Sequence, residues 1–181
     1  MTEELEVLEA VTRRLDEAHV PYMLTGSMAL NFYAVPRMTR DIDLVVELSP
    51  SDAERVNDLF QPDFYVDREA VRNAIELASV FNIIHTALVV KVDLVVRKDT
   101  DYRRTEFARR RRITFEGHPL SIVTPEDLII SKLDWARDSR STVQLDDARN
   151  ILRAQPHLDW RYLERWIAAL GLEALYREVA R

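Results

Sequence analysis

Cysteine is absent from this 181-residue chain, and glycine occurs only three times. Without cysteine the protein has no disulfide framework, no thiolate for a zinc site and no thiol nucleophile, so any metal must be held by oxygen or imidazole ligands. No run approaches the roughly 20 apolar residues that span a bilayer. The first residues, Met1 to Glu4, are acidic where a secretory signal would be basic. We therefore expect a cytoplasmic protein with no membrane contact.

The composition indicates a folded protein, because 47% of the residues are hydrophobic and 31% are charged. The length suits one compact domain, or a domain with a helical appendage. A net charge of -6 argues against a dedicated nucleic-acid binder, yet residues 97–112 hold eight basic and three acidic side chains. Arg109 to Arg112 could guide a polyanionic acceptor such as RNA, or could be a solvated helix end. Both interpretations stay open.

The spacing of apolar residues predicts an alternation of helices and strands up to residue 123. We expect helices over 3–19, 28–35, 51–60, 67–78 and 102–110, and strands over 20–24, 42–47, 81–84, 88–96, 113–115 and 120–123. Thr124 followed by Pro125 and two acids is a helix start, and helices are expected over 124–136, 146–152, 160–170 and 172–179. The predicted fold class is α/β (α+β): a mixed sheet flanked by helices in residues 1–123, with a helical extension, residues 124–181, packed on it.

Three aspartates stand at β-rich runs. Asp41 and Asp43 are two positions apart at the start of one run, so both side chains point to one face of a strand, about 7 Å apart at Cα. Asp93 begins the second copy of the sequence Asp-Leu-Val-Val, with Lys91 on the same face. Converging carboxylates repel one another unless a cation neutralises them, and oxygen ligands favour Mg²⁺, with Mn²⁺ as the alternative. The competing interpretation is that these aspartates cap turns and stay solvated.

Gly26 and Ser27 lie between an apolar run and a predicted helix. A residue without Cβ lets backbone N–H groups approach an anion, and the serine hydroxyl and the helix N-terminus both favour phosphate. An ordinary helix N-cap is the alternative.

The combination of Gly26-Ser27, Asp41-Ile42-Asp43 fourteen positions after Ser27, and Asp93 on a later strand resembles the signature of the nucleotidyltransferase superfamily related to polymerase β. Within that superfamily the chain is similar to small prokaryotic members, the abortive-infection toxin type and small antibiotic nucleotidyltransferases. Arg37 to Arg40 resembles the basic lead-in of these families. The motifs cover about residues 20–96 of a nucleotidyltransferase-like core, and the helical tail is similar to the family's usual appendage.

The resemblance implies roles for the matching positions. Asp41, Asp43 and Asp93 would be the catalytic carboxylates and the Mg²⁺ ligands, and Asp93 would also help to activate the acceptor hydroxyl. Gly26 and Ser27 would hold the nucleoside triphosphate. In the tail, Lys132 would contact phosphate, although a solvated lysine on a helix surface is equally consistent with the sequence.

Other tail residues are harder to interpret. Asp147 resembles a helical aspartate of the toxin-like branch, with Asp146 as a competing match, and Arg137 is not on the helical line of Lys132. Trp135, Trp160 and Trp166 suit helical packing faces and are expected in the core.

The resemblance predicts an Mg²⁺-dependent transfer of an NMP group from an NTP to a hydroxyl on RNA, a protein or a small molecule. A toxin with an antitoxin protein as partner is one setting, and a small-molecule or antibiotic nucleotidyltransferase is the nearest enzymatic alternative. A non-catalytic nucleotide-binding module of the same fold is the rival from another class.

Overall fold

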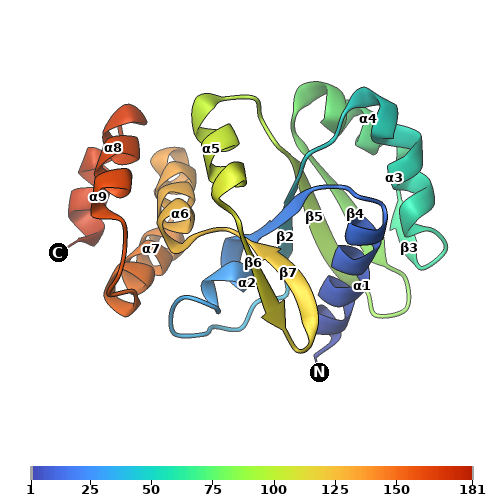
Figure 1. Cartoon of the computed structure of the whole chain (residues 1–181), viewed down its shortest axis with the longest axis horizontal. Coiled ribbons are helices and arrows are strands. Elements are labelled where there is room, and N and C mark those ends of the chain that lie inside the picture. The colour runs from blue at the N-terminus through green and yellow to red at the C-terminus, as the bar shows by residue number, and fades with distance from the viewer. Residues whose placement is uncertain (1, 181) are drawn as a thin grey trace.

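The computed structural model describes residues 2–180 (Figure 1). One sheet contains strands β1 (Tyr22–Thr25), β2 (Ile42–Val46), β3 (Phe64–Val66), β4 (Val80–His85), β5 (Val90–Val96), β6 (Arg111–Phe115) and β7 (His118–Ile122). The helices are α1 (Glu3–Glu17), α2 (Gly26–Leu30), the 3-10 helix η1 (Pro50–Asp52), α3 (Ala53–Phe60), α4 (Arg68–Leu77), α5 (Asp101–Arg109), α6 (Pro125–Ser139), α7 (Thr142–Ala154), α8 (Trp160–Ala169) and α9 (Glu173–Val179).

The sheet is mixed. Its strand order is β3-β4-β5-β2-β1-β7-β6, in which β2 with β5 and β1 with β7 are parallel and the other neighbours are antiparallel. In Figure 1, helices α1, α3 and α4 lie beside strands β3 to β5 on the right, and helices α6 to α9 gather on the left. The predicted fold class, a mixed sheet flanked by helices, is confirmed.

Strand β2 shows why the two faces of the sheet differ. Ile42, Leu44 and Val46 are almost completely buried, whereas Asp43 and Val45 alternate with them and are half-buried. Each fully buried aliphatic side chain contributes about 1.5–3 kcal/mol, so the apolar set fixes which face points to the core. A slip of one residue would bury Asp43 in that core. The alternation therefore places Asp43 on the less buried face.

Three elements differ from the expectation. Strand β3 was not expected, because three residues are too few to show a period, and it forms the edge of the sheet against β4. Helix α2 ends at Leu30 and not near residue 35, because the Asn31 side chain makes two hydrogen bonds to the backbone of Arg37 and closes a loop there. Helix α7 begins at Thr142, four residues earlier than expected, since its first turn is mostly exposed and carries no amphipathic signal.

The tryptophans divide into two groups. Trp166 is buried as expected, but Trp135 and Trp160 are 49% and 47% exposed. The expectation that all three lie in the core was therefore wrong for two of them, because helical spacing alone cannot tell a core face from one that meets a cleft or solvent. Among residues 2–180, no helix is long and apolar enough to cross a membrane. The proposed boundary after residue 123 stays a prediction.

Candidate functional site

Two of the predicted aspartates face each other across neighbouring strands. In the parallel pairing of β2 and β5, Asp43 lies directly opposite Asp93, and Thr25 at the end of β1 lies opposite Asp43 on the other side. Directly opposed side chains on one face are within contact range. The sheet register therefore brings together residues that are 50 positions apart in the sequence.

Asp93 is surrounded by donors. Its carboxylate accepts a hydrogen bond from Lys91 Nζ at 2.9 Å and another from Asn82 Nδ2. Asn82 lies opposite Asp93 on the antiparallel neighbour β4, and Lys91 lies two residues earlier on the same face of β5. The sequence predicted the position of Lys91 but not the contact with Asn82, because strand pairing joins the two.

Asp43 is the carboxyl group with the most perturbed acidity in this cluster. Burial and, after it, the charges of Asp93 and Asp41 raise its pKa to about 6, while the charges of Lys132 and Lys91 act in the opposite direction. Both other predicted aspartates are therefore close enough to act on Asp43, although Asp41, just before β2, is exposed. An opposed pair of this kind is stabilised by a cation placed between its members.

Gly26 packs directly against Asp43. The backbone of Gly26 has φ +67°, and a Cβ added there would lie 2.0 Å from Asp43 Oδ2. Glycine is thus required twice, for its backbone conformation and for the space that the carboxylate occupies. The sequence pattern suggested that Gly26 lets a phosphate approach, and the structure shows that it also lets the Asp43 carboxylate approach.

Ser27 belongs to a second polar cluster, which joins the loop after α2 to helix α7. Arg37 Nη2 donates to Ser27 Oγ, and the same guanidinium donates from Nε and Nη2 to the two carboxylate oxygens of Asp147, each at 3.0 Å. Lys132 Nζ on α6 donates to Asp147 Oδ2 at 2.8 Å. Two cations therefore share one carboxylate next to Ser27.

The cluster is buried. The side chains of Lys132 and Asp147 are 4% and 3% exposed, so Lys132 does not lie on a solvated helix surface. Burial alone would raise the pKa of Asp147, but the hydrogen bonds from Arg37 and Lys132 outweigh it, and the pKa lies below its ordinary value. Asp146 instead pairs with Arg149 on the exposed side of α7. The contact with Lys132 thus belongs to Asp147.

The two clusters meet at Lys132. Its charge lowers the pKa of Asp43, and its other neighbour is Asp147. The sequence did not give Arg37 a role of its own. The basic lead-in before Asp41 was the available signal, but the partner of Arg37 lies 110 positions away.

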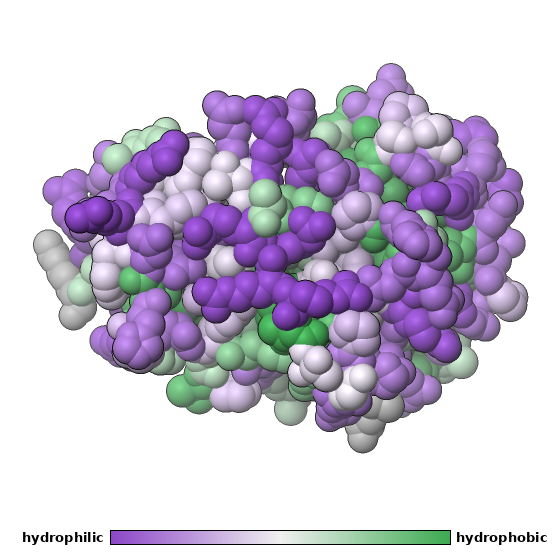
Figure 2. All heavy atoms as spheres, in the orientation of Figure 1, coloured by the Kyte–Doolittle hydropathy of each residue, from purple (hydrophilic) through white to green (hydrophobic). Residues whose placement is uncertain are grey.

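Two of the four arginines from Arg109 to Arg112 form ion pairs within the protein. Arg109 contacts Asp127 at 3.1 Å and Glu126 at 3.3 Å, and its guanidinium lies over the Tyr162 ring. Arg112 pairs with Asp16 at 2.8 Å. Figure 2, in the same orientation as Figure 1, shows hydrophilic side chains across the centre of the molecule, where Figure 1 places α5 and β6. For Arg109 and Arg112 the structure therefore favours a role in the protein's own packing over a role as a guide for RNA.

Replacing Arg109 with glutamine should destabilise the protein by about 2 kcal/mol, because fully buried Asp127 loses its charged partner. Arg111 on β6 is exposed, and Arg111→Gln is the matched control with an expected change below about 0.5 kcal/mol. Urea unfolding of the two variants measures both values. Equal and small changes would mean that Arg109 is not needed for folding and would restore the run as a candidate nucleic-acid contact.

The oxygen donors of the aspartate cluster are not preassembled as a metal site. In residues 2–180, no three His, Asp or Glu side chains are already arranged to hold a metal ion. Asp93 instead accepts hydrogen bonds from Lys91 and Asn82. The chemistry of the donor set nevertheless suits Mg²⁺, since it consists of carboxylates whose charges already act on one another at Asp43.

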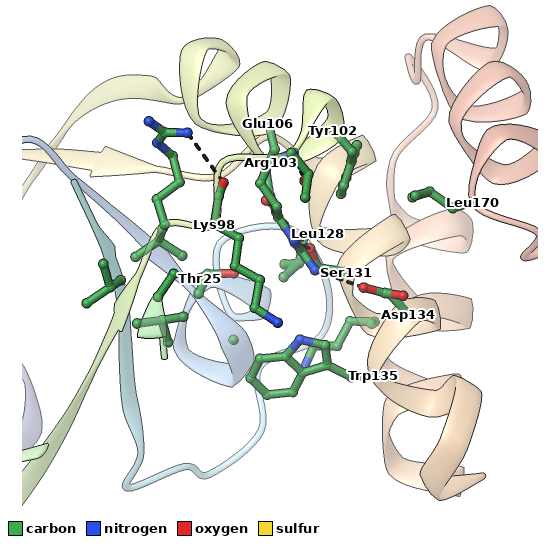
Figure 3. Close-up of a pocket in the computed structure, with 18 of the residues that line it drawn as sticks. Thr25, Lys98, Tyr102, Arg103, Glu106, Leu128, Ser131, Asp134, Trp135 and Leu170 are labelled. Atoms are coloured by element: carbon green, nitrogen blue, oxygen red, sulfur yellow. Dashed lines mark hydrogen bonds and ion pairs between the residues drawn. The ribbon is translucent and has the colours of Figure 1, made fainter. Parts of the chain in front are cut away.

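A cleft of about 810 Å³ opens beside the two clusters. Gly26 and Lys132 are among its lining residues, and its walls come from the end of β5 and from helices α5, α6 and α8 (Figure 3). The cleft is large enough for a drug-sized molecule. The site therefore combines a carboxylate pair, a buried cation and adjoining open space.

Comparison with solved structures identifies the fold. The chain is similar to the lincomycin-bound lincosamide antibiotic adenylyltransferase LnuA, with TM-score 0.56 and 11% identity over 86% of this chain and 98% of that one. It is similar to the antibiotic-resistance factor ANT(2'')-Ia, with TM-score 0.55 and 16% identity over 97% and 95%. The Megavirus polyadenylate synthase gives TM-score 0.54 and 15% identity over 87% of this chain and 32% of that one. No family model and no curated protein sequence matches the chain.

The chain therefore has the fold of the nucleotidyltransferases related to polymerase β. At these identities the likeness establishes the fold, and activity has to be argued from the site.

Proposed function

We propose that the protein is a nucleotidyltransferase that moves an NMP group from an NTP to a hydroxyl acceptor. The observation that carries the proposal is the opposition of Asp43 and Asp93 on parallel strands, with Gly26 packed against Asp43 and the charge of Lys132 acting on it. A protein of the same fold that catalysed no reaction would gain no stability from holding together carboxylates that repel one another.

Asp41, Asp43 and Asp93 are the residues that would hold Mg²⁺, or Mn²⁺ in its place. When bound, the ion would neutralise charge on the phosphates and on the oxygens that enter and leave. Asp93 has to exchange its contacts with Lys91 and Asn82 for this role. Before the substrate arrives, these contacts with Lys91 and Asn82 stabilise the acidic pair.

The remaining residues would position the donor. Ser27, with the buried cation Lys132 nearby, faces the side on which the triphosphate would lie, and Arg37 and Asp147 fix both of them. In the reaction the acceptor oxygen forms a bond to the α-phosphorus, and the bond from that phosphorus to the pyrophosphate oxygen breaks. Asp93 would assist loss of the hydroxyl proton, and pyrophosphate leaves with the electron pair.

The solved structures that resemble this chain support two candidate classes of acceptor. LnuA and ANT(2'')-Ia are named for antibiotics and antibiotic resistance, and the Megavirus protein for polyadenylate synthesis. A small-molecule acceptor is thus the nearest alternative to RNA. Partnership with an antitoxin rests on the sequence resemblance alone.

Labelling tests the proposal. Purified protein is incubated with Mg²⁺ and each α-³²P-labelled NTP in turn, together with total RNA and cell extract, and Asp43→Asn protein is treated alongside. We expect label on one class of acceptor with the native protein and none with the variant, because the amide cannot supply the carboxylate charge. Unchanged thermal unfolding of the variant verifies its fold.

Two outcomes would contradict the proposal. Equal labelling by the Asp43→Asn protein would remove the aspartates from the chemistry. Tight binding of Mg²⁺-NTP without label on any acceptor would favour a non-catalytic nucleotide-binding module.

A further inference from the structure

The cleft extends from the proposed site on the side of Asp93. Its lining includes Gly26 and Lys132, where the cleft meets the donor side, and the residues that follow Asp93 along β5 and beyond, from Val95 to Lys98, but not Asp93 or Ser27. In the proposed reaction Ser27 marks the donor side and Asp93 the acceptor side. The part of the cleft that continues past Asp93 therefore lies where the acceptor would bind, and this inference rests on the proposed function.

Apolar side chains are exposed inside this cleft. Leu77, Val80 and Trp135, all in its lining, are 72%, 51% and 49% exposed. Figure 3 shows the Trp135 indole projecting into the open space from α6. A large exposed ring in a concave surface offers a stacking platform for a planar ligand.

The carboxylates of the cleft already have partners. Asp134 contacts Arg103 and Arg137, each at 2.9 Å. Glu106 is held by Arg103 at 2.8 Å, and Asp101 pairs with an arginine on its own helix. Each of the three acidic side chains in the described lining is thus paired with an arginine, which weakens the attraction of the cleft for the ammonium groups of a polycation.

Lys98 is the opposite case. Within residues 2–180 its ammonium group makes no ion pair or hydrogen bond, and Figure 3 shows it pointing toward the same space as the Trp135 indole. An unpaired cation next to an exposed aromatic ring favours an anionic ligand.

Two buried polar atoms in the walls also lack partners among the described residues. They are Gln144 Oε1 and Trp166 Nε1, and both residues line the cleft. Buried polar atoms are nearly always satisfied in the working state of a protein. A bound molecule, or water held by it, would supply the missing donor and acceptor.

We propose that this cleft binds the acceptor, and that the acceptor carries a planar aromatic ring and a negative charge. The ring stacks on Trp135 and the anionic group lies at Lys98. The cleft favours such an acceptor over a polycationic aminosugar, because it offers an unpaired cation while its carboxylates are paired with arginines.

AMP is the smallest convenient probe that carries both features. Its binding is measured by equilibrium dialysis, with Mg²⁺ and α,β-methylene-ATP at saturation so that the donor side is filled and no transfer occurs. Trp135→Leu should weaken AMP binding about tenfold through loss of stacking. Lys98→Met should weaken it severalfold and reduce its dependence on salt. Trp160→Leu is the matched control, since Trp160 is equally exposed but lies outside the cleft, and should leave the affinity unchanged.

A panel of probes separates ring from charge. Adenosine has the ring alone, ribose 5-phosphate the charge alone, and tobramycin neither. We expect AMP to bind more tightly than adenosine or ribose 5-phosphate, and tobramycin not to bind. Tobramycin binding as tightly as AMP, or AMP binding that disappears when the ATP analogue saturates the protein, would overturn the inference.

A failure of the proposed function can be distinguished from a failure of the acceptor inference. Label transfer that does not need Asp43 would contradict the catalytic assignment while leaving AMP affinity as measured. Asp43-dependent transfer by a protein that has no affinity for AMP would contradict only the acceptor inference.

Discussion

Replacing Gly26 with alanine is expected to reduce nucleotidyl transfer at least about 100-fold and to destabilise the fold by about 2–4 kcal/mol. The methyl group would lie 2.0 Å from Asp43 Oδ2, so the carboxylate has to move. A displacement of about 1 Å at a reacting centre costs about 10²-fold in rate. The stability loss combines a non-glycine residue at positive φ with overpacking.

Gly171→Ala separates the two causes. Gly171 also has φ +67°, but an added Cβ there meets no atom within 4 Å. It should therefore lose about 1 kcal/mol, the cost of the backbone conformation, and keep its activity. Urea unfolding and pyrophosphate release measure the two variants in parallel. If both variants lose the same stability and neither loses activity, the contact between Gly26 and Asp43 has no functional weight.

The strands that carry the aspartates could be predicted because their signals are local. Alternation of apolar and polar residues over 42–46 fixes the direction of each side chain, and the structure shows that alternation as buried and half-buried positions. Strand pairing is not local. The sequence could place Asp43 and Asp93 on two strands but could not show that those strands are parallel neighbours in register.

Contacts across long separations were the part that sequence could not supply. Arg37 and Asp147 meet only because the Asn31 contacts shape the loop after α2 and because α7 packs beside it. Trp135 was misplaced for a related reason, since a helical period tells which residues share a face and not whether that face meets a neighbour or a cleft. The missed contact of Arg37 and the misplaced Trp135 both lie at the site, where the apolar pattern of the core ends.

Replacing Asp147 with asparagine should destabilise the protein by about 3–5 kcal/mol, the largest loss that we expect from removing one charge. Lys132 Nζ, 2.8 Å from Asp147, would remain buried without its anionic partner, and Arg37 would lose both of its charged hydrogen bonds. Asp146→Asn is the matched control. Asp146 is exposed and pairs only with Arg149 on the same helix, so its loss should cost less than about 0.5 kcal/mol.

The pH dependence of this difference tests its cause. The pKa of Asp147 lies below its ordinary value in the folded protein. Its contribution to stability is then complete above the unfolded pKa of about 3.9 and is lost as the pH falls through the lower, folded value. Urea unfolding of native and Asp147→Asn protein should give a constant difference from pH 7 to about pH 5, and a shrinking one below about pH 4 as protonation removes the same charge. A difference that stays constant to the lowest pH at which the protein folds would assign the loss to packing, and Asp147 would no longer be the anion that holds Lys132 and Arg37 beside Ser27.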